Sequence, residues 1–369
     1  MKYFSMPADF KKNTVDGYAG LNKKYNNSQI LETYGNITEK NIFCSGRADS
    51  CIPGVDKEKF EDYIKYSRDA GLDFNYTLNA PTIYNQEFTV EGIQKIEILL
   101  EMLDGLKVYN ITVSIPSLID VISKLDSRFK IRASTICQIT NVNEALAFKK
   151  LGVDKIVVKE SINRKFGTLK KILENFGDNV EVITNVICHK DCIYRIFHYL
   201  QDAFDYGQKT WGYDYYVIRC VQRMINDPAN ILRFSWIRPE DISKYENIGI
   251  KYYKMQGRQA VIAGNPVKAA EYYFKESYDG DLMHLLWLFS KYYSPSVKVD
   301  NKKLDSFLDG FLKSDSFCSN SCNECRYCNR IAEKAIYAGE LDLYQEYVNS
   351  DKYDKFKSAF EKICNGRDY

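Results

Sequence analysis

Histidine is scarce in this sequence, and long apolar runs are missing. Histidine occurs three times in 369 residues, as His189, His198 and His284. Neither His-Glu-x-x-His nor Gly-x-Ser-x-Gly is present, so the usual motifs of zinc peptidases and serine hydrolases are absent. No stretch approaches the ~18 consecutive apolar residues that a membrane helix needs. The sequence therefore predicts no membrane span.

An excess of charge of one sign is also missing. The 51 basic and 49 acidic side chains leave a net charge of +2, so no global field attracts the chain to nucleic acid or to an anionic membrane. The first residues contain no apolar run of signal-peptide length. Because 45% of the residues are hydrophobic, enough for a well-buried core, we expect a globular, cytoplasmic protein.

Short β-branched runs alternate with amphipathic stretches between residues 41 and 258, which is typical of repeated βα units and a parallel sheet. Strands are predicted at 41–45, 73–78, 111–114, 131–135, 155–158, 181–187, 215–220 and 250–256. Helices are predicted at 57–70, 90–103, 117–125, 142–151, 168–175, 193–204 and 239–247. This α/β pattern favours a closed (β/α)8 TIM-like barrel, although an open doubly wound sheet would give similar local patterns.

Beyond residue 258 the pattern changes to helix after helix, predicted at 266–275, 281–292, 302–312, 330–338 and 352–364. We therefore divide the chain into an N-terminal segment (1–40), the barrel (41–260) and a helical C-terminal extension with a cysteine-rich loop (261–369). In such a barrel, chemistry belongs to the loops at the carboxyl ends of the strands.

Eleven cysteines are what the sequence has in excess. Clustered cysteines in a reducing compartment are better explained as metal or cluster ligands than as disulfides. Cys188 and Cys192 follow one predicted strand and Cys220 closes the next, so three thiols are predicted to meet at the barrel mouth, which suits an iron–sulfur cluster. Cys44 is the candidate for a fourth ligand. The alternative is an iron open to substrate, which would act as a Lewis acid.

A second, tighter group comprises Cys318, Cys322, Cys325 and Cys328. Its separations of three, two and two residues are similar to a ferredoxin-type run, whereas a four-cysteine zinc site usually has a longer central spacing, so zinc is the alternative. The first three also match the radical S-adenosylmethionine spacing, but no barrel follows them. A core-packing role is expected for three further cysteines, namely Cys51, Cys137 and Cys364.

Several short motifs lie in order along the predicted barrel: Phe74–Ala80, Ala133–Ile136, Asn185–Cys188, Cys192–His198, Trp236–Asp241 and Lys254–Arg258. This series resembles the collagenase-like peptidase family, whose mechanism is uncertain, and the tail cysteines resemble members of the same group. The resemblance implies a possible relation to oxygen-independent hydroxylases of tRNA, ribosomal RNA or the ubiquinone ring. Those relatives carry a four-iron four-sulfur cluster and take oxygen from prephenate.

The resemblance also implies that Cys188, Cys192 and Cys220 are cluster ligands. A fourth cysteine cannot be matched, and Thr82 stands where some relatives have a cysteine. A dicarboxylate donor needs fixed cations, and arginine binds carboxylates through two parallel hydrogen bonds. The candidate substrate-binding residues are Arg258, Lys254 and Arg47.

Arg195 and His198, one helical turn apart, are the candidate catalytic side chains. His198 is either a proton carrier or a helix-packing residue. We expect an iron–sulfur oxidoreductase, an oxygen-independent hydroxylase or modifying enzyme that acts on RNA or on an anionic small molecule. A peptidase and a non-catalytic metal-binding partner subunit are the alternatives. Against a peptidase, Cys188 and His189 would point to opposite sides of an extended segment.

Overall fold

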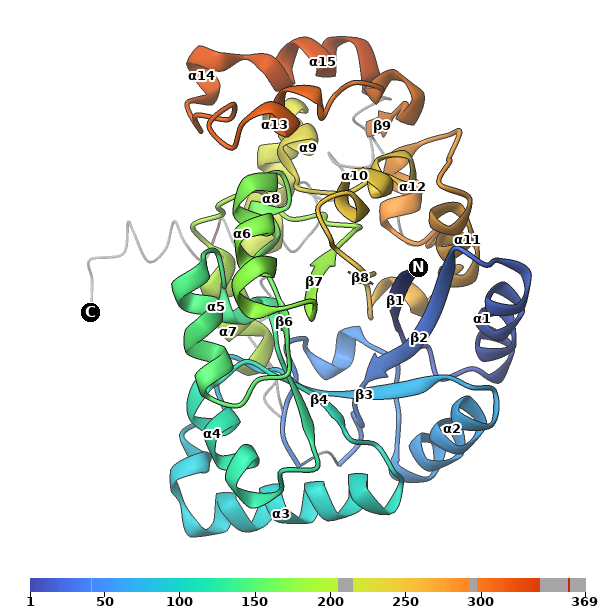
Figure 1. Ribbon diagram of the computed structural model, residues 1–369, viewed down its shortest axis with the longest axis vertical. Coiled ribbons are helices and arrows are strands. Elements are labelled where there is room, and N and C mark those ends of the chain that lie inside the picture. The colour runs from blue at the N-terminus through green and yellow to red at the C-terminus, as the bar shows by residue number, and fades with distance from the viewer. Residues whose placement is uncertain (41, 205–214, 292–296, 339–357, 359–369) are drawn as a thin grey trace.

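Eight parallel strands form a closed barrel in the computed structural model, which describes residues 1–40, 42–204, 215–291, 297–338 and 358. Each strand pairs with the next, and the last pairs with the first (Figure 1). The strands are β1 (Lys2–Pro7), β2 (Ser28–Gly35), β3 (Asp73–Leu78), β4 (Asn110–Val113), β5 (Lys130–Ala133), β6 (Lys155–Val157), β7 (Val180–Ile183) and β8 (Tyr252–Lys254). The predicted (β/α)8 barrel is confirmed.

Helices follow the strands and cover the outside of the barrel (Figure 1). They are α1 (Lys12–Lys24), α2 (Lys57–Asp69), α3 (Val90–Gly105), α4 (Pro116–Leu125), α5 (Val142–Lys150), α6 (Phe166–Phe176) and, after β8, α11 (Pro266–Lys275). Several begin at a capping side chain, which satisfies a backbone N–H of the first turn. Asp56 accepts a hydrogen bond from the backbone of Lys59 at α2, and Asn141 accepts one from Glu144 at α5.

The connection from β7 to β8 is much longer than the others and carries α7 (Arg195–Phe204), α8 (Tyr215–Asn226), α9 (Ala229–Arg233) and α10 (Ile242–Glu246). Single 3-10 turns occur at Asp49–Cys51, Gln86–Phe88, Thr135–Cys137, Glu160–Ile162, Pro239–Asp241, Ala260–Ile262 and Asn301–Leu304. No helix within the described ranges is long and apolar enough to cross a membrane.

The first two barrel strands lie where none was predicted. Residues 1–40, expected to precede the barrel, supply β1 and β2. The strand predicted at 41–45 is wrong: residues 42–45 belong to the loop between β2 and α2. Phe43 and Cys44 are buried there, and a short apolar run has the same appearance in a buried loop as in a buried strand.

The strand predicted at 215–220 is also wrong, because these residues begin helix α8. Val217, Val221 and Met224 recur at intervals of four and three residues, which is the spacing of one helix face. The segment begins with Tyr215, Tyr216, Val217 and Ile218, residue types that favour strands. This start obscured the helical spacing of the apolar residues. Cys220 therefore lies on a helix instead of at the end of a strand.

The C-terminal extension is not purely helical. It contains α12 (Leu282–Leu286), α13 (Asp309–Lys313), α14 (Cys322–Cys325) and α15 (Tyr327–Ala335), with an antiparallel strand pair, β9 (Val297–Val299) and β10 (Ile336–Ala338). Helix α15 packs against α9 of the β7–β8 connection. The helix predicted at 352–364, including Cys364, lies outside the described residues apart from Ser358.

Candidate active site at the barrel mouth

A small cavity of about 70 Å³ lies at the carboxyl ends of the barrel strands. The three predicted substrate-binding residues, Arg47, Lys254 and Arg258, all line it, together with Tyr34 and Tyr199. Arg47 comes from the β2–α2 loop, whereas Lys254 ends β8 and Arg258 follows it. The β2–α2 loop and the end of β8 with the residues after it thus bring three cations to one place.

Arg258 is held by neutral oxygen atoms. Its Nη1 donates to Asn36 Oδ1 at 2.7 Å, to Ser45 Oγ at 2.9 Å and to Thr77 Oγ1 at 3.1 Å. None of the hydrogen bonds among the described residues uses its Nε or Nη2, and no carboxylate there forms an ion pair with it. Burial, opposed by the Tyr34 hydroxyl, lowers the pKa of Arg258 to about 10. The Nη1 atom of the guanidinium is therefore fixed by hydrogen bonds, whereas Nε and Nη2 are available to a ligand.

Lys254 is buried next to Arg258, and its Nζ lies 3.8 Å from the centre of the Tyr34 ring. Burial lowers the pKa of Lys254 to about 8, and the charges of Arg132 and Arg258 contribute. Glu181 and Glu32 act in the opposite direction. The ring is held in turn, because the Tyr34 hydroxyl donates to the carbonyl of Met255 at 2.7 Å.

A charged layer inside the barrel supports this lysine. Arg132 on β5 pairs with Glu32 on β2 at 2.5 Å and with Glu181 on β7 at 3.3 Å. Ser5 on β1 donates to Glu32 at 2.7 Å. All four side chains are buried, so the pair energies are strong and the geometry is rigid. Because Arg132 engages both carboxylates of this layer, Lys254 next to the layer has no ion-pair partner among the described residues.

Arg47 connects the cavity to the predicted cluster cysteines. Its Nη1 pairs with Asp202 at 3.2 Å and its guanidinium lies 5.5 Å from the centre of the Tyr199 ring. Burial raises the pKa of Cys188 to about 12, the neighbouring Cys220 and Cys192 thiols raise it further, and Arg47 lowers it. Cys188 is therefore close to both other thiols and to a cation of the cavity.

Cys188 thus lies near both Cys192 and Cys220, although Cys220 arrives from a helix. Cys188 and Cys192 lie in the segment between β7 and α7, and all three are partly exposed. In the part of the chain that is described, no three His, Cys, Asp or Glu side chains converge tightly enough to hold a single metal ion. Three neighbouring thiols fit an iron–sulfur cluster in donor type. The fourth donor is not assigned by this arrangement.

The contacts of Cys44 are with residues other than these three cysteines. Its Sγ donates to the carbonyl of Thr82 at 3.7 Å, and it packs against Ala80 and Ala203. Burial raises the pKa of Cys44 to about 11. Thr82, the position where relatives of the resembled family have a cysteine, is therefore a direct neighbour of Cys44.

Two other cysteines differ from each other. Cys137 is half-buried, and its thiol donates to the carbonyl of Ser114 at 3.4 Å, consistent with packing. Cys51 was expected to be buried and is exposed. It lies in a 3-10 turn directly after the polar residues Asp49 and Ser50, which favour solvent.

Arg195 is a positioning residue in this structure. It is buried, its Nη1 pairs with Glu160, and its Nη2 donates to the carbonyl of His189 at 2.6 Å. Thr135, which lines the cavity, donates to Glu160 at 3.1 Å. A chain of contacts therefore runs from the cavity wall to the segment that carries Cys188.

His198 lies outside the cavity wall. Its ring is 5.8 Å from the ring of Tyr216 on α8, and the next residue, Tyr199, is the one that lines the cavity. This placement agrees with the helix-packing alternative for His198. The residues that sequence reasoning missed are Tyr34, Glu160 and Tyr199. Tyr34 lies on an unpredicted strand, and the other two belong to no motif.

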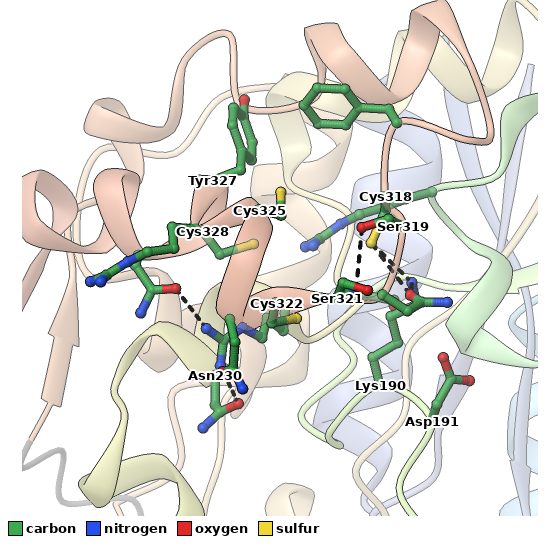
Figure 2. A pocket seen from close by; sticks show the side chains of 18 of the residues that line it. Lys190, Asp191, Asn230, Cys318, Ser319, Ser321, Cys322, Cys325, Tyr327 and Cys328 are labelled. Atoms are coloured by element: carbon green, nitrogen blue, oxygen red, sulfur yellow. Dashed lines mark hydrogen bonds between the residues drawn. The ribbon is translucent and has the colours of Figure 1, made fainter.

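The tail cysteines lie elsewhere. Cys318, Cys322, Cys325 and Cys328 line a separate cavity of about 440 Å³ between the extension and the β7–β8 connection (Figure 2). The second cysteine group predicted from the sequence is thus brought together, apart from the cavity at the mouth.

Comparison with known proteins supports the resemblance. Residues 44–188 match the model of peptidase family U32. The chain is 28% identical over 345 residues to the uncharacterized protease MJ1657 of Methanocaldococcus jannaschii, which covers 90% of this chain and 98% of that relative. The solved structure of the U32 peptidase Mk0906 superimposes with a TM-score of 0.50 at 14% identity, over 69% of this chain and 92% of that one. That likeness supports the fold.

Proposed function

Because residues 44–188 match the model of peptidase family U32, we propose that the chain is an enzyme whose barrel mouth binds a carboxylate-bearing small molecule beside an iron–sulfur cluster. The reaction class proposed is oxygen-independent hydroxylation, with prephenate as the oxygen donor and RNA or a small metabolite as the acceptor. The observation that carries the proposal is the cavity lined by Arg47, Lys254 and Arg258 next to Cys188.

The cations of the cavity are suited to a dianion. Arg258 keeps Nε and Nη2 for an acceptor, which is the arrangement that binds a carboxylate with two parallel hydrogen bonds. Lys254 forms no ion pair among the described residues, so its charge is open to a ligand. Both side chains are desolvated before the ligand arrives, which strengthens their attraction for an anion. Tyr34 and Tyr199 supply flat apolar walls.

Cys188, Cys192 and Cys220 are the proposed cluster ligands. A bound cluster would supply electron transfer, or an iron that acts as a Lewis acid. The protein's own part is to place the thiols: Arg195 fixes the carbonyl of His189, next to Cys188, and Arg47 offers positive charge to both the thiol and the cavity. A substrate held by Arg47 would therefore lie beside Cys188.

Calorimetry with prephenate on anaerobically purified protein tests the proposal. Arg258→Lys keeps a positive charge but loses the two-pronged contact, so prephenate should bind about tenfold to a hundredfold more weakly, as expected for one charged hydrogen bond. Lys244→Met is the control, because Lys244 lies on α10 and pairs with Asp241, and neither residue lines the cavity. Equal affinity in the Arg258→Lys variant and the parent would remove Arg258 from the site.

A peptidase is the second candidate, since the relative MJ1657 is named as a protease. The Nε2 of the His189 ring lies 3.0 Å from the carbonyl oxygen of Cys220, so this atom is engaged by a backbone oxygen and not by a thiol. Hydrolysis of casein or gelatin by metal-free protein, unaffected by Cys188→Ser, would favour the peptidase and contradict the proposal.

A further inference from the structure

We propose that the cavity between the C-terminal extension and the β7–β8 connection holds a second metal centre, an iron–sulfur cluster bound by Cys318, Cys322, Cys325 and Cys328. The cavity measures about 440 Å³ and all four thiol side chains line it (Figure 2). It is a different cavity from the one at the barrel mouth, and the inference stands without the proposed function.

The local fold gathers the four thiols. Cys322 and Cys325 are the first and last residues of α14, and Cys328 lies in the first turn of α15. Arg326 between the two helices has a left-handed backbone with φ of 49°, so the chain changes direction there. Cys318 precedes α14. Consecutive short turns therefore present all four side chains to the same hollow.

The cavity wall is strongly positive, although the whole chain has a net charge of only +2. Its side chains that are charged at neutral pH, leaving the thiols aside, are five bases and one acid, namely Arg164, Lys190, Arg223, Arg233, Arg326 and Asp191. Lys190 Nζ lies 3.4 Å from Cys318 Sγ. Four thiolates around a metal centre carry net negative charge, and these cations would compensate it.

Arg164 is a buried cation whose surroundings suggest an anionic ligand. Its side chain is 7% exposed, and its Nη atoms donate to the backbone carbonyls of Leu232 and Phe234. Its Nε has no hydrogen-bond partner among the described residues, and neither does the Nε of Arg233. A buried polar group without a partner is costly. Two such donors beside four thiols suggest that the cavity is built for a charged occupant.

The sequence separations of the thiols favour a cluster over a single zinc ion. Three, two and two residues lie between successive cysteines, which is similar to a ferredoxin-type run. A four-cysteine zinc site usually has a longer central spacing. All four cysteines line one hollow of about 440 Å³.

One segment connects the two proposed centres. Cys188 faces the mouth thiols, whereas the next residues, His189 and Lys190, line the tail cavity. His189 also packs edge-on against Phe234, with ring centres 5.1 Å apart. The two sites therefore share this segment, with Cys188 near the mouth thiols and His189 and Lys190 in the wall of the tail cavity.

The test uses the full chain with Cys188→Ser and Cys192→Ser, which removes the mouth ligands. Reconstituted anaerobically with iron and sulfide, this double variant should retain about four iron and four sulfide per chain with broad visible absorption. Adding Cys322→Ser should abolish this iron, sulfide and colour. Adding Cys51→Ser, which changes an exposed cysteine in another loop, should leave them unchanged. Circular dichroism checks that each variant is folded.

The outcomes separate the two proposals. One zinc per chain without sulfide, or no metal at all in a folded double variant, would overturn the tail cluster while leaving the mouth untested by that result. Failure of the mouth cluster would instead appear as unchanged iron when Cys188→Ser and Cys192→Ser are introduced.

Lys190→Met should lower the midpoint potential of the tail cluster, because a positive charge near a ligand sulfur stabilises the reduced form. An unchanged potential would contradict the placement of the cluster beside Lys190.

Discussion

Lys254 and Arg258 owe their chemistry to what surrounds them at the level of single atoms. Each is a buried cation whose nearest partners are neutral: an aromatic ring for Lys254, and amide and hydroxyl oxygens for Arg258. The carboxylates that act on Lys254, Glu32 and Glu181, are engaged by Arg132. Asp49 and Asp202 act on Arg258 without forming an ion pair with it. The two cations at the mouth therefore remain without an ion-pair partner among the described residues.

Anion binding at the mouth should depend on pH through Lys254. Its pKa is lowered to about 8, mainly by burial, so the ammonium is present below pH 8 and is lost as the pH rises above it. Calorimetry with prephenate should show constant affinity from pH 6 to about pH 7.5 and weaker binding above pH 8. Lys254→Arg should keep binding across the range, since arginine stays charged. A pH profile that is the same in both proteins would exclude Lys254 as the titrating group.

The residues of this site could be predicted only in part. Arginine's fit to carboxylates, applied to the ends of predicted strands, identified Arg47, Lys254 and Arg258, which the structure places in one cavity. Tyr34 and Glu160 could not be identified in this way. Each acts through a contact with a residue distant in sequence, and a single sequence does not display such contacts.

At the scale of elements, the predicted strand count is correct although two of its members are not. Lys2–Pro7 and Ser28–Gly35 were missed because both strands mix polar with apolar residues and neither contains a continuous β-branched run. Strands were predicted instead at 41–45 and 215–220. A short apolar run looks the same in the sequence of a strand, a buried loop and a helix, so it cannot tell them apart. Arg47 nonetheless lies at the mouth as predicted, because its loop follows the carboxyl end of β2 instead of the strand expected at 41–45.

Arg195 at the start of α7 should govern the β7–α7 segment. Arg195→Met leaves the buried carboxylate of Glu160 without its cation and frees the carbonyl of His189. We expect a loss of about 3–5 kcal/mol in the free energy of unfolding, measured by urea denaturation. Alkylation of Cys188, followed by mass spectrometry, should also become faster, because the segment loses its anchor.

Lys159→Met is the matched control for this change. Lys159 pairs with Asp191 of the same segment at 3.7 Å, but Asp191 is exposed. An exposed pair contributes about 0–1 kcal/mol, so both stability and Cys188 alkylation should stay near the values of the parent protein. If the Arg195→Met and Lys159→Met variants behaved alike, Arg195 would have no positioning role.

For the molecule as a whole, the extension is joined to the barrel by buried polar contacts as well as by apolar packing. Arg238, in the β7–β8 connection, pairs with Asp241 at 2.7 Å and donates to the carbonyl of Asn301 in the extension at 2.7 Å. Tyr273 on α11 donates to the carbonyl of Ile237 at 2.7 Å. One hydrophobic core continues from the barrel into the extension through Trp236 and Phe307. We therefore expect barrel and extension to unfold together.

Asp315 offers a direct test of this coupling. Helix α6 has no capping side chain of its own, and Asp315 from the extension takes that role by accepting hydrogen bonds from the backbone of Gly167 at 2.9 Å and of Thr168 at 2.7 Å. Asp315→Ala should lower the free energy of unfolding by about 0.5–2 kcal/mol, the range for loss of an N-cap. Asp315→Asn, which keeps an acceptor oxygen, should lose less.

The same change should reach the thiol loop, because Asp315 lies three residues before Cys318. Releasing it from α6 frees the segment that leads into the tail cavity, so limited proteolysis should cut the chain faster near residues 313–320 in Asp315→Ala than in Asp315→Asn. Iron bound by the tail cysteines should fall in the same order, since metal binding and local folding are coupled. Faster cleavage with unchanged urea stability would mean that the extension opens independently of the barrel, contrary to the single cooperative unit inferred here.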